Sequence, residues 1–264
     1  MLKFITCCCF LFVAPSLAFG QATKIQIESA AVQVVRKNFG ENFKGLNPLN
    51  TQKTGTTMVL IMQAPKGGII KVLSDKSKLE SFTDDKGTNL LGKKKFDNGL
   101  GGFPKVAADG KAAMIDIKGT NLPVKGATLL RAKGTITVAI ATTKKKIKSK
   151  PFAVKVGEKV AVGDINFVIT KAGKPGYGKQ PLEISFQTKQ DVAAIASYGF
   201  EDAAGKTIKS TASGTSRFGF NNNYTVTASH RLDEKVSKCT LVVEIWTDKR
   251  DVSVPFNLSG GVGG

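Results

Sequence analysis

The nine residues Phe82-Thr-Asp-Asp-Lys-Gly-Thr-Asn-Leu90 return later in the chain as Phe200-Glu-Asp-Ala-Ala-Gly-Lys-Thr-Ile208, with Phe, Asp, Gly and a closing Leu or Ile at identical spacing. Two further matches follow in the same order. Residues 134–145 align without a gap with residues 239–250, and both segments continue to a Pro-Phe pair, beginning at Pro151 and at Pro255. Three matches in one order predict a tandem duplication, so we expect the chain to contain one module twice.

Apolar and polar residues alternate with a period of two along most of the chain, as at Ile136, Val138 and Ile140. This period is typical of half-buried β-strands, and no long stretch has helical spacing. Turn signals such as Asp97-Asn-Gly99 separate the runs. The pattern predicts an all-β fold of two tandem antiparallel β-sandwich domains related by internal duplication. Each half resembles an immunoglobulin-like module, although it lacks the Cys…Trp…Cys core of that family.

The first twenty residues have the features of a secretory signal peptide. Lys3 precedes an apolar run, and Ala18 and Gly20 place small residues before a cleavage point at Gln21. A lipid anchor on one of the cysteines at 7–9 is the alternative, but no Leu and small residues precede them as in a lipobox. We therefore expect a secreted, periplasmic or cell-surface protein, with no transmembrane segment in the mature chain.

The Pro-Phe ends are expected to be closing strands, because proline is tolerated at a strand start or a sheet edge. This places the domain boundary soon after the first Pro-Phe pair. The predicted organisation is a signal peptide at 1–20, a strongly basic sandwich at 21–156 and a second sandwich at 157–264, ending in a flexible tail at 260–264. Three of the four cysteines lie in the signal peptide, so Cys239 remains alone and is expected to be a small buried residue.

The basic charge is concentrated in the first half of the sequence. Residues 21–150 hold 24 Lys and Arg against 9 Asp and Glu, and residues 151–264 hold 14 against 11, so the net charges are +15 and +3. Four lysines that recur at every second position would form a stripe roughly 20 Å long on an extended strand. This lysine stripe consists of Lys144, Lys146, Lys148 and Lys150, and the run Lys93, Lys94 and Lys95 adds to it.

Two interpretations of the lysine stripe remain open. The spacing suits successive charges of an anionic polysaccharide or another polyanion, which would bind to the first domain with strong salt dependence. Alternatively, the lysines protect an edge strand from pairing with another chain, or simply keep the protein soluble.

The sequence contains few candidate catalytic residues. His230 beside Arg231 lies in a polar stretch and is expected to be a solvated loop residue, since no nucleophile motif accompanies it. Asp84 and Asp85 are expected to cap a turn rather than bind a metal. Trp246 is expected to pack in a core or between the domains. We therefore predict no catalytic residue, no cofactor and no metal.

These observations favour a non-enzymatic binding or structural protein of a bacterial envelope. One form of this hypothesis is recognition of an anionic polymer through the basic first domain. The alternative is a scaffold or adhesion module that binds an envelope protein. A hydrolase whose carboxylates converge from distant strands is the minor alternative.

Overall fold

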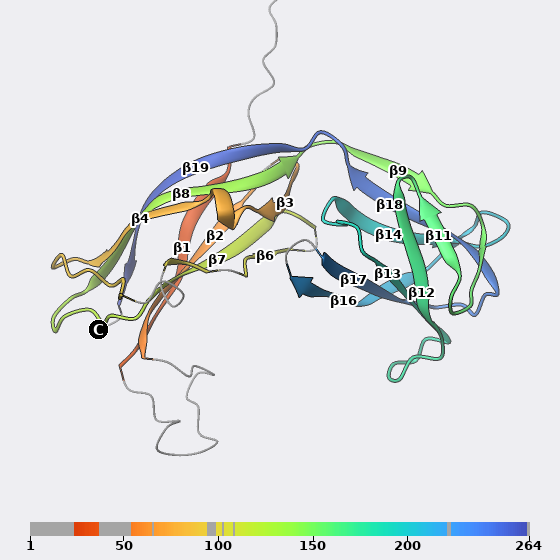
Figure 1. The fold of residues 1–264 in the computed structure, drawn as a ribbon, viewed down its shortest axis with the longest axis horizontal. Coiled ribbons are helices and arrows are strands. Elements are labelled where there is room, and N and C mark those ends of the chain that lie inside the picture. The colour runs from red at the N-terminus through yellow and green to blue at the C-terminus, as the bar shows by residue number, and fades with distance from the viewer. Residues whose placement is uncertain are drawn as a thin grey trace, which may run out of the picture.

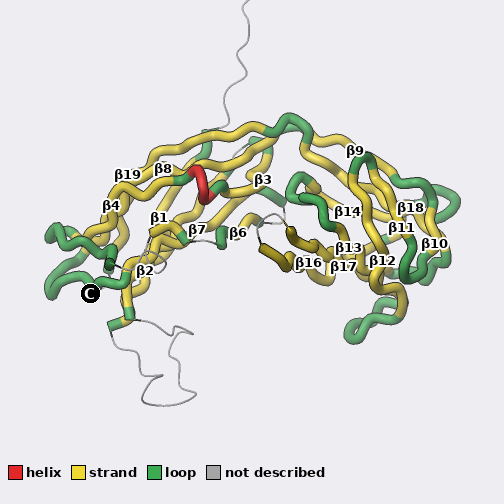
Figure 2. The backbone as a smooth tube through the Cα atoms, viewed as in Figure 1, coloured by secondary structure: helices red, strands yellow, loops and turns green. Residues whose placement is uncertain are grey.

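The computed structural model describes residues 24–36, 54–64, 66–93, 99–101, 103–107, 109–220 and 223–262. In these residues the protein is all-β, as the sequence predicts, and its strands form four antiparallel sheets. Figure 2 shows how completely strands dominate, with one 3-10 turn at Ser74–Lys76. The sheets pack in two pairs, and the two resulting sandwiches form the two limbs of an arch (Figure 1).

The first sandwich consists of two sheets whose strand orders are β1-β2-β7-β5, with β6 also on β7, and β19-β8-β3, with β4 also on β8. Its strands are β1 (Gln26–Val35), β2 (Gly55–Gln63), β3 (Gly68–Val72), β4 (Lys78–Asp84), β5 (Gly99–Leu100), β6 (Lys105–Val106), β7 (Ala112–Gly119), β8 (Leu129–Ala141) and β19 (Arg250–Gly261). Alternate residues of β2, β7 and β8 point inward and build one continuous core, in which Met58, Ile115 and Phe82 are fully buried.

The second sandwich consists of a sheet with the order β10-β18-β14-β15, with β9 also on β18, and a sheet with the order β11-β12-β13-β17-β16. Its strands are β9 (Lys144–Lys148), β10 (Phe152–Ala153), β11 (Lys159–Val162), β12 (Ile165–Gly173), β13 (Leu182–Thr188), β14 (Ile195–Glu201), β15 (Thr207–Ile208), β16 (Ser210–Phe220), β17 (Asn223–Leu232) and β18 (Lys238–Trp246). Phenylalanines meet in its core. Phe186 is 6.0 Å from Phe167 and 5.9 Å from Phe200 between ring centroids.

Strand pairing does not follow the predicted division at residues 156 and 157. β9 and β10 pair with β18 in the second sandwich, and the last strand, β19, returns to pair with β8 in the first. Figure 1 shows β8 and β19 side by side along the outer edge of the arch, where both continue into the second sandwich. The sequence pattern does not determine which strand pairs with which, because a strand can hydrogen-bond with any sheet edge of matching register. The prediction of a flexible tail at 260–264 is wrong for Gly260 and Gly261, which belong to β19, and residues 263 and 264 lie outside the described residues.

The two motifs that begin the repeat have the same local structure. In each, the backbone N–H of a glycine with positive φ donates to the carbonyl of the Asp three residues earlier, at 3.2 Å for Gly87–Asp84 and 3.1 Å for Gly205–Asp202. In each, the Asp carboxylate also accepts hydrogen bonds from two following backbone N–H groups. This confirms the turn-capping role of Asp84, and the Asp85 carboxylate binds Thr128 in the next loop.

The two chain crossings between the sandwiches lie side by side and are hydrogen-bonded to each other. The Thr247 N–H donates to the Thr143 carbonyl at 3.2 Å, and the two threonine hydroxyls are 2.9 Å apart. One Asp248 carboxylate oxygen accepts from the backbone N–H groups of Thr142 and Thr143, both at 2.8 Å, and the Thr142 hydroxyl donates to the other oxygen. These hydrogen bonds hold the pKa of Asp248 below its usual range.

Trp246 packs at the junction of the sandwiches. The residue is only 6% exposed. A Cβ atom on Gly68 of β3 would lie 2.6 Å from Trp246 Cζ2, so a strand of the first sandwich approaches this ring so closely that only glycine fits. The expectation that Trp246 packs in a core or between the domains is confirmed, and the contact is with the first sandwich. Cys239 is likewise buried and free, as expected, and burial raises the pKa of its thiol to about 12.

Candidate functional site

The lysine stripe lies in the second sandwich, whereas the sequence assigned it to the first. Its strand, β9, pairs with β18 in a register that sets Lys144 opposite Trp246 and Lys148 opposite Val242. The expected alternation is present, because Ile147 packs against the core while the β9 lysines are exposed. Lys150 follows the strand and is exposed.

Neighbouring strands partly neutralise the lysine stripe. Lys146 Nζ lies 3.9 Å from a Glu244 carboxylate oxygen, and Lys148 Nζ lies 2.7 Å from a Glu201 oxygen. Lys144 Nζ lies 4.4 Å from the centroid of the Trp246 ring, a cation–π distance. Each exposed ion pair contributes only about 0–1 kcal/mol to stability, but together the carboxylates reduce the charge that a polyanion would meet. This arrangement favours the interpretation of the lysine stripe as edge protection.

The crossing also redistributes the net charge. By sequence, segments 21–143 and 250–264 hold 20 Lys and Arg against 10 Asp and Glu, and residues 144–249 hold 18 against 10. The net charges are therefore +10 and +8, so neither sandwich carries most of the positive field. Of the second predicted run, Lys93 is exposed, and Lys94 and Lys95 lie outside the described residues.

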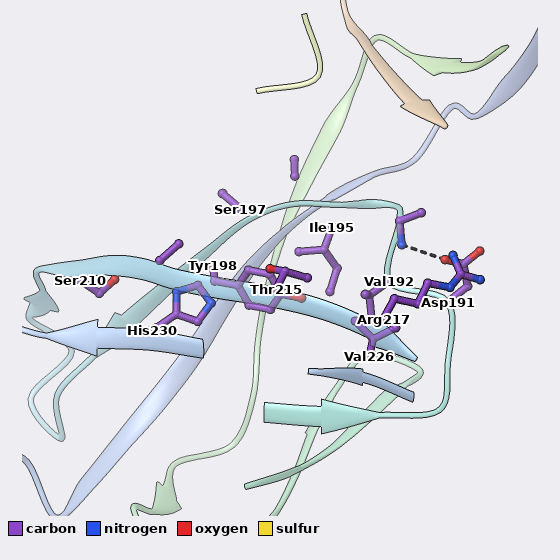
Figure 3. A pocket seen from close by; sticks show the side chains of 13 residues that line it. Asp191, Val192, Ile195, Ser197, Tyr198, Ser210, Thr215, Arg217, Val226 and His230 are labelled. Carbon is purple, nitrogen blue, oxygen red and sulfur yellow. Dashed lines mark hydrogen bonds between the residues drawn. The ribbon is translucent and has the colours of Figure 1, made fainter. Parts of the chain in front are cut away.

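A pocket of about 500 Å³ lies between the two sheets of the second sandwich. Figure 3 shows its labelled side chains, with Asp191 and Arg217 at one end, Ile195 in the middle and His230 at the other end. Strand β14 and the loop before it form one wall, and β16 and β17 form the other. The complete lining is Asp191, Val192, Ala193, Ile195, Ala196, Ser197, Tyr198, Ser210, Ala212, Thr215, Arg217, Val226 and His230.

His230 is a buried strand residue, not the solvated loop residue that the sequence predicted. It lies on β17, is 5% exposed, and has its ring 4.8 Å from Tyr198 and 5.5 Å from Phe200. Burial lowers the pKa of His230 to about 4 and raises the pKa of Tyr198 to about 12, because both ionised forms would lose hydration. At neutral pH both side chains are therefore uncharged, and this end of the pocket can offer neutral hydrogen-bonding groups and aromatic surface to a ligand.

The missed signal for His230 is the period of two along β17. Val226, Ala228, His230 and Leu232 are all buried, and the residues between them are less so. The polar neighbours of His230 therefore occupy the opposite face of the sheet, and their polarity says nothing about His230 itself.

Strand β16 forms the open side of the pocket. Thr215 and Arg217 are exposed although they line it, and Phe218 is 81% exposed on the strand. β16 pairs with β17, and no other described strand pairs with its second edge. No sequence signal marks β16 as a functional strand, because its Ser, Thr and Gly residues carry no chemical motif.

Among the residues that the structure describes, no group of three or more His, Cys, Asp or Glu side chains could hold a metal ion. None of the described helical segments has the length and apolar character required to cross a bilayer. Searches against protein-family models, curated proteins and solved structures found no match to this chain.

Proposed function

We propose that this chain is an exported, non-catalytic structural protein, in which two immunoglobulin-like sandwiches arose by duplication and are joined by exchange of their last strands. The observation that carries this proposal is the reciprocal pairing of β9 with β18 and of β19 with β8. The second sandwich thus contains β9, which follows β8 of the first repeat in the sequence. The first sandwich contains β19, which follows β18 of the second repeat. The product is one two-limbed body suited to hold partners at a fixed spacing in a bacterial envelope.

Strand order supports the immunoglobulin-like part of the proposal. Constant-type immunoglobulin domains place strands A, B, E and D in one sheet and C, F and G in the other. In the first sandwich these positions correspond to β1-β2-β7-β5 and to β4-β8-β19. In the second they correspond to β12-β13-β17-β16 and to β14-β18-β9.

Register supports the duplication and the exchange. The shift that aligns residue 134 with residue 239 also relates the two exchanged ladders. Ile140 on β8 pairs with Arg250 on β19, and their repeat equivalents, Ile245 on β18 and Lys145 on β9, pair with each other. Two unrelated ladders would have no reason to share this register, whereas two copies of one module that exchange the same strand must share it.

The exchange also suggests what replaces disulfide bonds in an exported protein. Cys239 is the one cysteine in residues 21–264, so no internal disulfide can form there. Twelve residue pairs join β19 to β8, and five join β9 to β18, so the two repeats are linked by a large number of backbone contacts. Such links resist separation of the repeats without a disulfide bond between them.

Cleavage at the predicted domain boundary tests this proposal. A protease site would be inserted between Val156 and Gly157, in an exposed turn where Val156 is 62% exposed. We expect the fragments to co-elute in gel filtration at the size of the intact chain and to separate only in denaturant. An equivalent nick in the exposed turn at Lys125 and Gly126 is the control for cleavage itself. Fragments that separate in native buffer would show that each repeat closes on its own last strand.

Polyanion binding is a second candidate function, favoured by the net charge of +18 in residues 21–264. With the charge divided almost equally between the sandwiches, such binding would be weak, spread over both limbs and screened by salt. Retention on heparin tests it, as developed in the Discussion.

A further inference from the structure

The free edge of β16 has an unusual combination of length, exposure and low charge. The strand has eleven residues, Ser-Thr-Ala-Ser-Gly-Thr-Ser-Arg-Phe-Gly-Phe, with Arg217 as its only charged side chain and with no proline. Residues 211–219 are exposed, apart from Ser213, which is half-buried. An edge strand of this kind presents unpaired backbone N–H and C=O groups and is a template for another strand.

Three other edge strands in the described part of the molecule have features that discourage such pairing. β9 has lysine at four of its five positions. β19 contains Pro255, which lacks an N–H donor. The edge of β1 is close to β19, since a Cβ atom on Gly260 would lie 2.7 Å from Val32 Cγ2. β16 is long and has none of these features, so its open edge calls for a functional explanation.

The pocket lies on the inner side of this same strand. Thr215 and Arg217 of β16 point into it, and Ile195, Tyr198 and Val226 are among its apolar lining residues (Figure 3). A strand added to β16 would send every second side chain toward this opening, because side chains alternate across a strand. Backbone pairing at an edge together with a pocket for alternate side chains is the way in which domains bind extended peptides.

We propose that β16 and the adjacent pocket bind an extended segment of an acidic partner protein, which adds to the sheet as a strand and inserts an apolar side chain between Ile195 and Tyr198. Charge indicates an acidic partner. The mature chain carries +18, of which residues 144–249, the second sandwich, carry +8, so an acidic segment is attracted. A second copy of this chain brings the same positive charge and is repelled.

The β16 binding surface rests on the proposed structural function and adds to it a partner protein bound by the second sandwich. Its test does not depend on the strand exchange. A nicked protein that separates would refute the exchange and leave the β16 edge unaffected. Failure of peptide binding would refute the binding surface and leave the exchange unaffected.

Defined peptides can test the proposal on the full mature chain. The probe is a fluorescent Glu-Val-Glu-Phe-Glu-Val-Glu peptide. Its variants carry Lys in place of Glu, Ala in place of the central Phe, or Pro in place of both Val residues. Fluorescence anisotropy at moderate salt should show that the probe binds, that the lysine and proline versions bind at least about tenfold more weakly, and that loss of the central Phe weakens binding about tenfold.

Two protein variants locate the binding. Phe218→Glu changes an 81% exposed residue on the edge and should weaken binding at least about tenfold. Val168→Glu is the matched control, because it adds the same charge to β12 in the same sheet, at a 39% exposed position away from the edge. Thr215→Phe fills the pocket from its rim and should remove most of the difference between the Phe and Ala peptides.

Several outcomes would overturn the proposal. These are absence of binding up to about 1 mM peptide, equal binding of the proline or lysine peptide, or equal loss in Phe218→Glu and Val168→Glu. A protein that sediments as a dimer and becomes monomeric in Phe218→Glu would show that a second copy, not an acidic partner, occupies the edge.

Discussion

Unfolding of the two sandwiches should be thermodynamically coupled. Residues 144–246 supply all the strands of the second sandwich and form a continuous segment. The first sandwich is different, because β8 ends at Ala141 and its neighbour β19 begins at Arg250. The folded second sandwich holds these two strand ends together through the paired crossings at Thr143 and Thr247.

The size of this coupling follows from loop closure. If the second sandwich unfolds, β8 and β19 are joined by a flexible loop of roughly 100 residues, which costs about 4 kcal/mol of closure entropy. That is a large fraction of the 5–15 kcal/mol that stabilises an ordinary domain. The same free energy acts on the second sandwich. While the first sandwich is folded, it holds the two ends of residues 144–249 together and restricts the unfolded state of the second.

A pair of matched core substitutions tests the coupling. Phe82 and Phe200 begin the repeated motif, are 0% and 1% exposed, and belong to the first and second cores. Each Phe→Ala change should lower the free energy of unfolding of its own sandwich by about 3–5 kcal/mol. Either substitution should therefore also destabilise the other sandwich, by up to the coupling free energy of about 4 kcal/mol.

Two local probes distinguish the sandwiches. Reaction of the buried thiol of Cys239 reports the second, and hydrogen exchange of the β2 and β7 amides reports the first. The control is Phe103→Ala, because Phe103 is 95% exposed and its loss should change stability by less than about 0.5 kcal/mol. If each substitution affected the stability of its own sandwich alone, the argument from loop closure would be refuted.

Three further predictions concern charge and packing. Replacing the four residues of the lysine stripe with Gln should reduce heparin retention no more than replacing four first-sandwich lysines, since the net charges are +10 and +8; a selective loss would restore the stripe as a binding face. Because the folded-state pKa of His230 is lowered to about 4, the unfolded chain binds the extra proton, and stability should fall by up to about 3 kcal/mol as the pH decreases from 6.5 to about 4. Urea unfolding of His230→Gln should lack this component, and an unchanged pH profile would contradict it. Gly68→Ala should destabilise the protein by about 1–3 kcal/mol and alter Trp246 fluorescence, whereas Gly173→Ala, with no atom within 4 Å of the added carbon, should do neither.

Local structure was predictable wherever neighbouring residues determine it. The period of two identified an all-β chain, and the Asp-x-x-Gly spacing identified the turns at Asp84 and Asp202, which have matching hydrogen bonds. Burial of Cys239 followed from its place at the start of an apolar strand. In each case the signal lies within a few residues, where backbone geometry and side-chain period act directly.

Partner choice was not predictable, because the competing strands are nearly equivalent. Residues 134–145 and 239–250 have similar apolar patterns, so β9 and β19 could each pair with β8 or β18 in the same register. The preference depends on contacts distant in sequence, such as Trp246 against Gly68. The pocket and the free edge of β16 depend in turn on how two sheets meet, and neither leaves a motif in the sequence.

The crossing itself explains how one chain selects the exchanged pairing. If each repeat closed on its own last strand, residues 141–144 and 246–249 would become tight hairpin loops and could no longer lie against each other. The exchanged form keeps both segments extended, so Asp248 can accept three hydrogen bonds from Thr142 and Thr143. In the alignment of residues 134–145 with 239–250, Asp248 stands opposite Thr143, so this contact depends on a difference between the two segments. Two identical segments would lack the pairing of one Asp with two threonines, and this difference therefore favours the observed crossing.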